Sequence, residues 1–301
     1  MTTSTLKDPR LTGAFTAIVT PFTKDGASID DARLDEQIAF QAAGGVKGIV
    51  IAGTTGESPT LSESEYRELV TSCVRRAHEH KMLAIVGTGS NCTAHAVELQ
   101  HFARSAGADC TLSVNPYYNK PTQEGLYRHF MAIADGADIG VMLYNIPGRS
   151  GVALEPTTVE RLNAHANIVA NKEATGSTTS ASEIVERCPG LALLSGDDPM
   201  TLPFASVGGV GVVSVLSNVV PERISALCAA FLAGKWGEAR TIHESLLGLA
   251  RAMFSETNPI PVKAAMAMLG RDSGSMRLPM TEATEGTKAR LKSALADAGL
   301  R

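Results

Sequence analysis

The residue that most clearly suggests chemistry is a lysine at the end of an apolar run. Lys172 lies at the end of an apolar, β-branched run that begins at Ile168, and Glu173 and a glycine turn follow it. Lysine is among the residues least often fully buried, so a lysine that ends such a run needs a reason. A neutral lysine amine can attack a carbonyl, lose water and form a Schiff base. We therefore consider covalent amine chemistry at position 172.

This chemistry requires Lys172 to be uncharged near neutral pH. The pKa of a free lysine is about 10.4, and lowering it to about 7.5 disfavours the charged form by about 4 kcal/mol. An apolar interior can supply that free energy through desolvation of the amine. The competing interpretation is a solvated surface charge, which is the ordinary state of a lysine at the end of a strand.

Three further polar segments end neighbouring apolar runs: GTTGE (53–57), NPYY (115–118) and YNIPGR (144–149). A tyrosine can pass a proton along a chain that includes a hydroxyl such as that of Thr55. Arg149 offers a rigid fork for a carboxylate. Each segment also has a plainer explanation. GTTGE could be a capped turn, the tyrosines of NPYY could pack at a subunit contact, and Arg149 could form a surface salt bridge. Their joint occurrence favours an active site.

Metal and hydrolase chemistry lack their usual residues. All seven histidines fall in predicted helices or the turns beside them, whereas a transition-metal site would want His or carboxylate ligands at strand ends. The paired carboxylates Asp197 and Asp198 are interpreted as a cap at the start of the next helix. The patterns GxSxG and GxxxxGK[ST] are absent, which argues against a serine hydrolase and a P-loop. We expect no metal and no cofactor.

The candidate residues would be positioned by a regular alternation of strands and helices. Amphipathic stretches with apolar residues at i, i+3 and i+4, such as 30–44, 63–79 and 93–107, predict helices between the strands. The predicted strands cover residues 14–22, 48–57, 82–89, 109–116, 139–147, 167–175, 191–198 and 209–217. Such repeats predict a parallel sheet with crossover helices.

Two closures of that sheet are possible, an open doubly wound sheet and a (β/α)8 TIM barrel. Eight evenly spaced units favour the barrel, and GxGxxG is absent after the first strand. Residues 12–220 are predicted to form the barrel with the active site. Residues 221–301 are predicted to be a C-terminal helical extension, made of helices only and packed on the barrel without a flexible linker.

Composition excludes several classes of partner. A net charge of −4 and a pI near 6.0 argue against a nucleic-acid or anionic-membrane surface. The first ten residues lack the apolar core of a signal peptide, and no apolar run reaches the length of a membrane span. The five cysteines are scattered without CxxC pairing, which indicates reduced thiols in a cytoplasmic protein.

The sequence resembles the pyruvate-dependent class I aldolase and lyase family, which includes N-acetylneuraminate lyase and dihydrodipicolinate synthase. The resemblance extends from about Thr12 to Leu300. It rests on the motifs GTTGESPTL (53–61), VGTGSN (86–91), NPYYNKPTQEGLYRHF (115–130), YNIPGRSGV (144–152), KEATGS (172–177) and SGDDP (195–199).

This resemblance implies specific catalytic roles. Lys172 would form the Schiff base with pyruvate, and Tyr144 would be the general acid and base, relaying protons through Thr55 and Tyr118. In the family the second tyrosine of the YY pair reaches into a neighbouring subunit's site. The resemblance therefore implies a homo-oligomer, usually a tetramer built as a dimer of dimers.

The substrates follow from the same resemblance. Thr54 and Thr55 would hold the pyruvate carboxylate, and Gly196 and Val213 would line the pocket. Arg149 matches the arginine with which dihydrodipicolinate synthases grip the carboxylate of aspartate semialdehyde. The expected reaction is condensation of pyruvate with L-aspartate 4-semialdehyde, on the way to diaminopimelate and lysine. The alternatives are a related aldolase or dehydratase for another 2-oxo acid, such as a sugar acid or N-acetylneuraminate, and a non-catalytic ligand-sensing homologue.

A regulatory cleft is the last feature that the resemblance implies. Members inhibited by lysine bind it in a cleft at the dimer interface, with histidines or similar groups on the helix after GTTGE and with an acidic residue on the helix after the GTGxN loop, which pairs with the ligand's ammonium. Here His95 replaces that acid, so we expect lysine to inhibit weakly or not at all. The corresponding positions in this sequence are Ser58, Glu63, Tyr66, Asn91, His95 and Tyr117.

Overall fold

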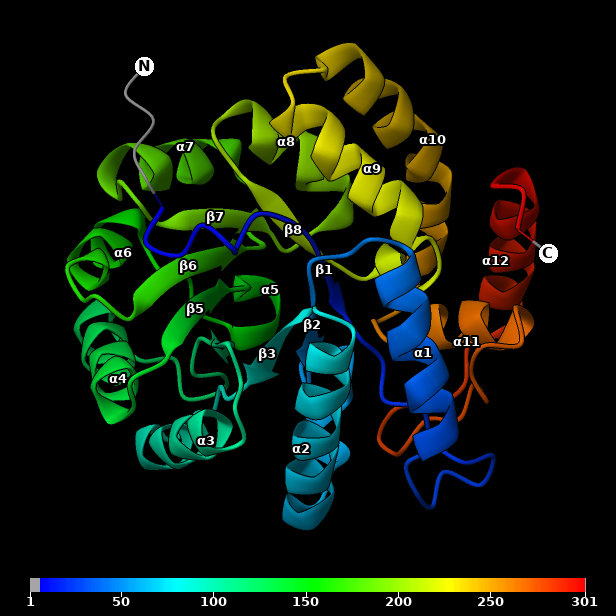
Figure 1. The fold of residues 1–301 in the computed structure, drawn as a ribbon, viewed down its shortest axis with the longest axis horizontal. Coiled ribbons are helices and arrows are strands. Elements are labelled where there is room, and N and C mark those ends of the chain that lie inside the picture. The colour runs from blue at the N-terminus through cyan, green and yellow to red at the C-terminus, as the bar shows by residue number, and fades with distance from the viewer. Residues whose placement is uncertain (1–5, 301) are drawn as a thin grey trace. The chain divides into compact units, whose positions relative to one another are not determined.

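Eight strands form the centre of the fold. The computed structural model describes residues 6–300, and the strands follow one another from β1 to β8 in a closed barrel (Figure 1). Their bounds are β1 Gly13–Ala17, β2 Gly48–Ile51, β3 Leu83–Gly87, β4 Cys110–Val114, β5 Gly140–Asn145, β6 Ile168–Glu173, β7 Ala192–Ser195 and β8 Gly211–Ser214. Each predicted run overlaps one strand, and the prediction of a (β/α)8 TIM barrel with C-terminal helices is confirmed.

Helices alternate with these strands and continue after β8. The α-helices are α1 Asp31–Ala43, α2 Glu63–Glu79, α3 Thr93–Ser105, α4 Gln123–Gly136, α5 Pro147–Ser150, α6 Pro156–Asn163, α7 Thr178–Arg187, α8 Thr201–Ser206, α9 Pro221–Leu232, α10 Trp236–Met253, α11 Ile260–Met268 and α12 Glu285–Asp297. Short 3₁₀ turns are η1 Ser58–Thr60, η2 Asp198–Met200 and η3 Leu216–Asn218. The predicted helix at 63–79 coincides with α2.

Local sequence explains where several helices begin. The Ser62 side chain accepts a hydrogen bond from the backbone of Glu65, and the Glu65 carboxylate accepts one from the backbone of Ser62. This reciprocal cap satisfies two amides that a helix start leaves without partners. Asp30 and Thr122 cap α1 and α4 in the simpler way, each accepting from a backbone amide three residues on.

The chain divides into two compact units. One comprises Leu83–Val213 together with the described residues up to Gly13, and the other comprises Ala14–Met82 with the described residues from Ser214 onward. The predicted domain boundary at residue 220 stays a prediction.

The unit that contains Leu83–Val213 carries β3 to β7 and most of β8. Its strands are parallel: Leu112 of β4 pairs with Met142 of β5, which pairs with Ala170 of β6 after a shift in register between Val141 and Met142. Between these strands and α3 to α8 lies a core of fully buried side chains that includes Phe130 and Phe204. Burying apolar surface of this kind is the main driving force that holds strands and helices together.

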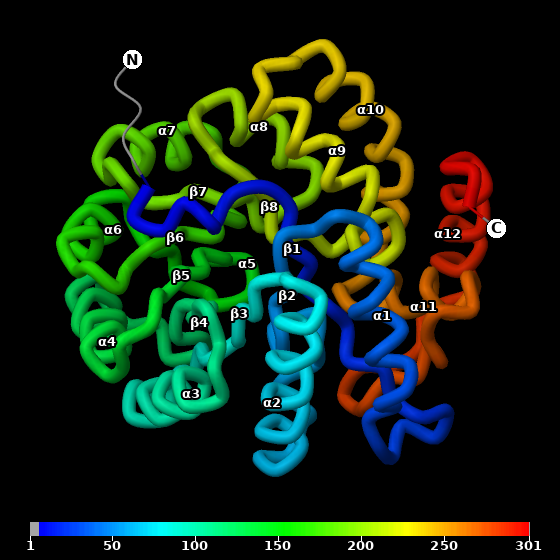
Figure 2. Tube along the Cα trace, in the orientation of Figure 1, coloured from blue at the N-terminus to red at the C-terminus, as the bar shows by residue number. Residues whose placement is uncertain are grey.

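The second unit carries β1, β2, α1, α2 and α9 to α12. Strands β1 and β2 are parallel, and α10 packs against both α9 and α12 (Figure 2). Gly44, at the end of α1, allows a close approach, because a Cβ there would lie 2.5 Å from the Cβ of Pro221 at the start of α9. Only glycine fits this packing without displacing α9.

One expectation about this unit is wrong. The sequence from 258 onward was expected to contain helices only, yet residues 269–284 form an irregular segment between α11 and α12. Gly270 and Gly274 adopt φ angles of +71° and +77°, which a right-handed helix does not allow. Pro279 also lacks the amide that a helix interior needs.

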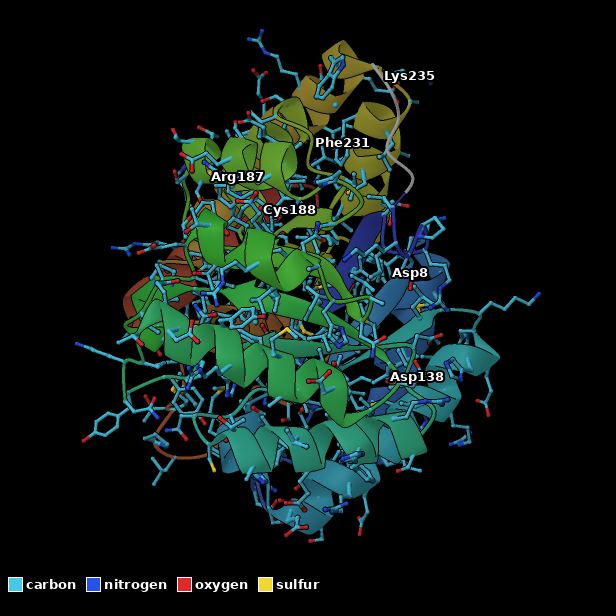
Figure 3. All side chains as sticks on the ribbon, turned by 90° about the vertical axis from the view of Figure 1, so that its left-hand side faces the viewer. Asp8, Asp138, Arg187, Cys188, Phe231 and Lys235 are labelled. Atoms are coloured by element: carbon cyan, nitrogen blue, oxygen red, sulfur yellow. The ribbon has the colours of Figure 1, made fainter. Side chains whose placement is uncertain are left out.

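The cysteines and helices bear on the environment of the chain. All five cysteines are free, and four of them are buried. Figure 3 shows Cys188 beside Arg187 at the end of α7, where burial raises the pKa of the Cys188 thiol to about 11. Among the helices of residues 6–300, none has both the length and the apolar character that crossing a membrane requires.

Candidate active site

Strand β6 carries Lys172 into a buried position. Parallel pairing sets Lys172 beside Tyr144 of β5 and Leu194 of β7, and the three strands lie side by side (Figure 1). Only 6% of Lys172 is exposed, and its Nζ lies 4.1 Å from the centroid of the Tyr144 ring. The structure therefore excludes the solvated surface charge as an interpretation of this lysine.

The residue after β7 makes room for this lysine. A Cβ built on Gly196 would lie 3.0 Å from both Cγ and Cε of Lys172 and 2.9 Å from the Cβ of Ala174. Any side chain at position 196 would press on the lysine, so glycine is required for close approach. Val213 on β8, the other predicted pocket residue in this unit, is 1% exposed.

Burial changes the charge state of Lys172. Desolvation lowers the pKa of the amine to about 7, while the negative charge of Asp198 raises it and the positive charge of Arg149 lowers it. A large fraction of the amine is thus uncharged at neutral pH. That is the state in which a lysine can act as a nucleophile.

Tyr144 stands next to the amine and keeps its proton. Burial raises the pKa of the phenol to about 12, with a smaller lowering by Arg149 and a smaller raising by Asp197. A phenol of this kind is a hydrogen-bond donor at neutral pH. It can donate its proton to an oxygen that becomes negative beside Lys172 and take the proton back later.

The two aspartates after β7 act differently from the expectation. Asp197 occupies the position before the 3₁₀ turn η2, but its side chain makes no capping hydrogen bond there. Instead the two carboxylates belong to the electrostatic surroundings of Lys172 and Tyr144, and burial raises the pKa of Asp197. Their place directly after strand β7 was the signal in the sequence that could have assigned them to the site.

Arg149 lies on the segment that follows β5. It belongs to the single turn α5, where its amide donates to the carbonyl of Ile146 at 3.0 Å. The neighbouring Ser150 is buried, and its hydroxyl donates to the carbonyls of Ile146 at 3.0 Å and Val152 at 2.8 Å. Arg149 itself is exposed. Its guanidinium, on a hydrogen-bonded turn, can therefore bind an anion.

The two neighbouring tyrosines of NPYY are the exposed aromatics of this unit's loops. Tyr118 is 90% exposed, with a left-handed φ of +74°, and Tyr117 is 41% exposed. A left-handed conformation is uncommon for a tyrosine, and the exposed fraction shows that this side chain makes little contact with the protein that carries it. The structure of one chain thus leaves the Tyr118 hydroxyl outside.

The threonines of GTTGE lie in the other compact unit. Thr54 is half-buried, and Thr55 is buried with a hydroxyl that accepts a hydrogen bond of 2.9 Å from Nδ2 of Asn258. Glu57 ends this turn with a φ of +54°, and its carboxylate accepts a hydrogen bond of 2.7 Å from Nζ of Lys263. No pattern in the sequence indicates that Asn258 and Lys263 hold this turn, because they lie 203 and 206 positions away from their partners Thr55 and Glu57.

The six positions of the predicted regulatory cleft fall into both units, three in each. Glu63 is exposed and pairs with Arg67, while burial raises the pKa of Tyr66. In the other unit, His95 is exposed and its Nδ1 lies 3.4 Å from the Glu98 carboxylate. Ser58 begins η1, and Asn91 and Tyr117 lie in the loops after β3 and β4.

The histidines keep away from the strand ends, as predicted, and lie in helices or directly after them. Within residues 6–300 there is no group of three or more His, Cys, Asp or Glu side chains that could hold a metal ion.

Comparison with known proteins decides the family. The model of the dihydrodipicolinate synthetase family matches residues 10–298. The chain belongs to the dihydrodipicolinate synthetase family. Its likeness to a curated member of this family, the 4-hydroxy-tetrahydrodipicolinate synthase of Nitratidesulfovibrio vulgaris, amounts to 48% identity over 97% of this chain and 99% of that protein.

Solved structures of dihydrodipicolinate synthases have the same fold. The enzyme of Aquifex aeolicus superposes with a TM-score of 0.94 at 42% identity, over 96% of this chain and 99% of that one. The enzyme of Acinetobacter baumannii, solved in complex with pyruvate, gives 0.94 at 39% identity, over 97% of this chain and all of that one. The family resemblance expected from the sequence motifs is therefore confirmed.

Proposed function

We infer that this chain catalyses the 4-hydroxy-tetrahydrodipicolinate synthase reaction. In that reaction pyruvate condenses with L-aspartate 4-semialdehyde, in the diaminopimelate route to lysine. The observation that carries this conclusion is the buried amine of Lys172, its pKa lowered to about 7, against Tyr144, in a chain that shares close to half its residues with a curated synthase.

The first steps use the amine of Lys172. Its lone pair attacks C2 of pyruvate, the carbonyl oxygen takes up protons and leaves as water, and a C=N bond to Nζ remains. Loss of a proton from the pyruvate methyl group gives an enamine, because the imine accepts the electron pair. The enamine carbon then attacks the aldehyde carbon of the second substrate. The amine of the aspartate semialdehyde part then attacks C2 of the former pyruvate. This step closes the ring and breaks the bond from C2 to Nζ, which releases Lys172.

We propose Tyr144 as the general acid and base of these steps. Its raised pKa keeps the proton available for the departing oxygen, and its ring already lies 4.1 Å from the Lys172 nitrogen. Thr55 and Tyr118 are proposed as the relay that connects this phenol with solvent. Support for this relay comes from the family resemblance of GTTGE and NPYY.

The two carboxylates of the substrates need separate partners. We propose that Thr54 and Thr55 bind the pyruvate carboxylate, and that Gly196 and Val213 line the pocket around it. Arg149 is proposed to bind the carboxylate of aspartate semialdehyde. The exposed guanidinium on a hydrogen-bonded turn supports that role, since a planar fork matches a carboxylate.

We propose that the protein works as a homo-oligomer, a dimer of dimers, in the cytoplasm. The 90% exposure of Tyr118 supports an oligomer, because the family resemblance implies that this tyrosine enters the site of a neighbouring subunit, where it would be covered. The free, mostly buried cysteines support a reducing compartment. Sedimentation velocity of the wild type and of Tyr118→Trp would measure the assembly and its dependence on this contact.

Lysine is proposed to be a weak inhibitor or none. An ammonium group needs a carboxylate partner, and position 95 holds a histidine paired with Glu98 instead. Initial rates with lysine at about 1 mM should match those without it. Half-inhibition below that concentration would contradict the proposal.

Turnover assays test the function itself. Purified enzyme with pyruvate and L-aspartate 4-semialdehyde should consume both, and omission of either should stop the reaction. Cleavage of N-acetylneuraminate without any condensation of the semialdehyde would assign the chain to another branch of the aldolases.

A further inference from the structure

A buried polar cluster lies on the outer side of the two strands that carry the catalytic pair. On β5 and β6, Tyr144 pairs with Lys172, and one step further Asn145 pairs with Glu173. Side chains of consecutive strand residues point to opposite faces of a sheet. The pair Asn145 and Glu173 therefore lies directly behind the pair that does the chemistry.

Glu173 is a fully buried carboxylate that several donors surround. It accepts hydrogen bonds from Nδ2 of Asn145 at 3.1 Å, from Nδ2 of Asn171 at 3.2 Å and from the amide of Thr175 at 3.0 Å. Burying a carboxylate without such donors would destabilise the folded state strongly. Its position and that of the Asn145 carboxamide are consequently fixed relative to one another.

Asn145 uses every hydrogen-bonding position of its side chain. Besides donating to Glu173, Nδ2 donates to the carbonyl of Leu154 at 3.0 Å, and Oδ1 accepts from the amide of Leu154 at 2.9 Å. Oδ1 also accepts from Nδ2 of Asn115 at 3.2 Å, and the same nitrogen donates to the carbonyl of Val152 at 3.1 Å. This carboxamide thus mimics a strand neighbour for the backbone of Leu154.

These contacts close the segment from residue 146 to residue 154 at its base. The segment leaves β5 at Asn145 and returns to the side chain of the same residue at Leu154. Arg149 lies between these two ends, on the turn α5. The placement of the Arg149 guanidinium accordingly depends on the buried carboxamide at the base of its segment.

We propose that Asn145, held by Glu173, is a positioning residue for Arg149 and thereby for the carboxylate of the second substrate. The proposal rests on the proposed function, in which Arg149 binds that carboxylate. Binding groups must be held closely, because a displacement of about 1 Å can cost about 100-fold in rate. Loss of the two hydrogen bonds between the Asn145 side chain and the Leu154 backbone lets the segment 146–154 move, while Lys172 and Tyr144 keep their places in the strands.

The test is Asn145→Ala, assayed separately for each substrate. KM for L-aspartate 4-semialdehyde should rise by about 10-fold or more. The pyruvate concentration that half-saturates borohydride trapping of the imine on Lys172 should change by less than about 2-fold, since that step precedes the second substrate. Equal losses for both substrates, or no change in either, would overturn the proposal.

Asn171→Ala is the matched control. It also removes a buried carboxamide that donates to Glu173, yet no hydrogen bond from Asn171 reaches the segment 146–154 among those described. It should lower the melting temperature without raising KM for the semialdehyde. If it raises that KM as much as Asn145→Ala does, general loosening explains both and the positioning role is wrong.

Coupling to Arg149 provides a readout that loss of stability cannot imitate. In an Arg149→Ala background, Asn145→Ala should have little further effect on KM for the semialdehyde, because the guanidinium it positions is gone. Full additivity of the two substitutions would contradict the proposal.

Two outcomes need separate treatment. If Asn145→Ala fails to fold, Asn115→Ala removes the neighbouring donor to Val152 and to Asn145, and it should show the same split between substrates at a smaller size. If the wild type itself does not turn over the semialdehyde, the proposed function fails. If the wild type does so and the split is absent in both variants, only the positioning role fails.

Discussion

Two lysines are buried among residues 6–300, and their surroundings differ in one decisive respect. Lys263 is fully buried, and its Nζ donates to the carboxylate of Glu57 at 2.7 Å and to the carbonyl of Thr20 at 3.0 Å. Lys172 is almost as buried, but its Nζ faces the ring of Tyr144 at 4.1 Å. Lys263 has a carboxylate partner, whereas desolvation is the main influence on the amine of Lys172.

The difference separates a structural lysine from a chemical one. The Glu57 carboxylate lies within hydrogen-bonding distance of the Lys263 amine, so Lys263 serves to hold Glu57 and the turn after β2. Desolvation favours the neutral amine, and it lowers the pKa of Lys172 to about 7. Burial alone does not make a nucleophile, because the partner of the buried group decides its charge.

Lys172→Met gives the largest effect that this comparison predicts. Methionine keeps the apolar length of the side chain and removes the amine, so turnover should fall by at least about 10⁴-fold. Steady-state assays with both substrates measure the loss, with circular dichroism to show that the fold persists. A variant that keeps even a tenth of the activity would remove Lys172 from the mechanism.

Lys263→Met should act on stability. It leaves the Glu57 carboxylate buried without its counter-charge, which costs about 3–5 kcal/mol in comparable cases. Urea unfolding monitors the change, and Lys263→Met combined with Glu57→Gln should recover most of it. If the single substitution leaves the unfolding free energy unaltered, the contrast between the two lysines is not the one described.

Lys172→Met should also stabilise the protein, most strongly at low pH, and the pH-dependent part of this gain is the smaller effect to measure. The pKa is about 10.5 in the unfolded chain and about 7 in the folded one, so the unfolded state binds more protons between these values. The cost of Lys172 is therefore greatest below about pH 7 and declines as pH rises. From about pH 6 to about pH 9 the advantage of methionine should shrink by roughly 2–3 kcal/mol in urea unfolding. A constant difference would mean that the amine titrates normally.

Much of the fold and part of the site could be predicted from the sequence. The alternation of apolar runs and amphipathic stretches located all eight strands, because a parallel barrel buries its strands on both faces. Lys172 stood out for the same reason, as a charge at the end of a buried run. The irregular segment at 269–284 is not anticipated, although Gly270, Gly274 and Pro279 are residues that interrupt helices.

The contacts behind the site could not be predicted in the same way. The meeting of Asn145 with Glu173 depends on the register of two strands that are 28 residues apart. The hydrogen bond from Asn258 to Thr55 spans 203 positions and depends on where α11 begins. Periodicity within one segment carries no information about such pairs. The positions of Asp197 and Asp198 were visible, yet their role depended on side-chain orientation.

The central claim is that Lys172 is a neutral amine at physiological pH and forms an imine with pyruvate. The direct test is borohydride trapping with pyruvate over a range of pH, with the modified residue located by peptide mass spectrometry. The account predicts modification at Lys172, with an initial trapping rate that rises through a midpoint near pH 7 and then levels off. Modification at another lysine, or a rate that still rises above about pH 9 as for an ordinary amine, would contradict it.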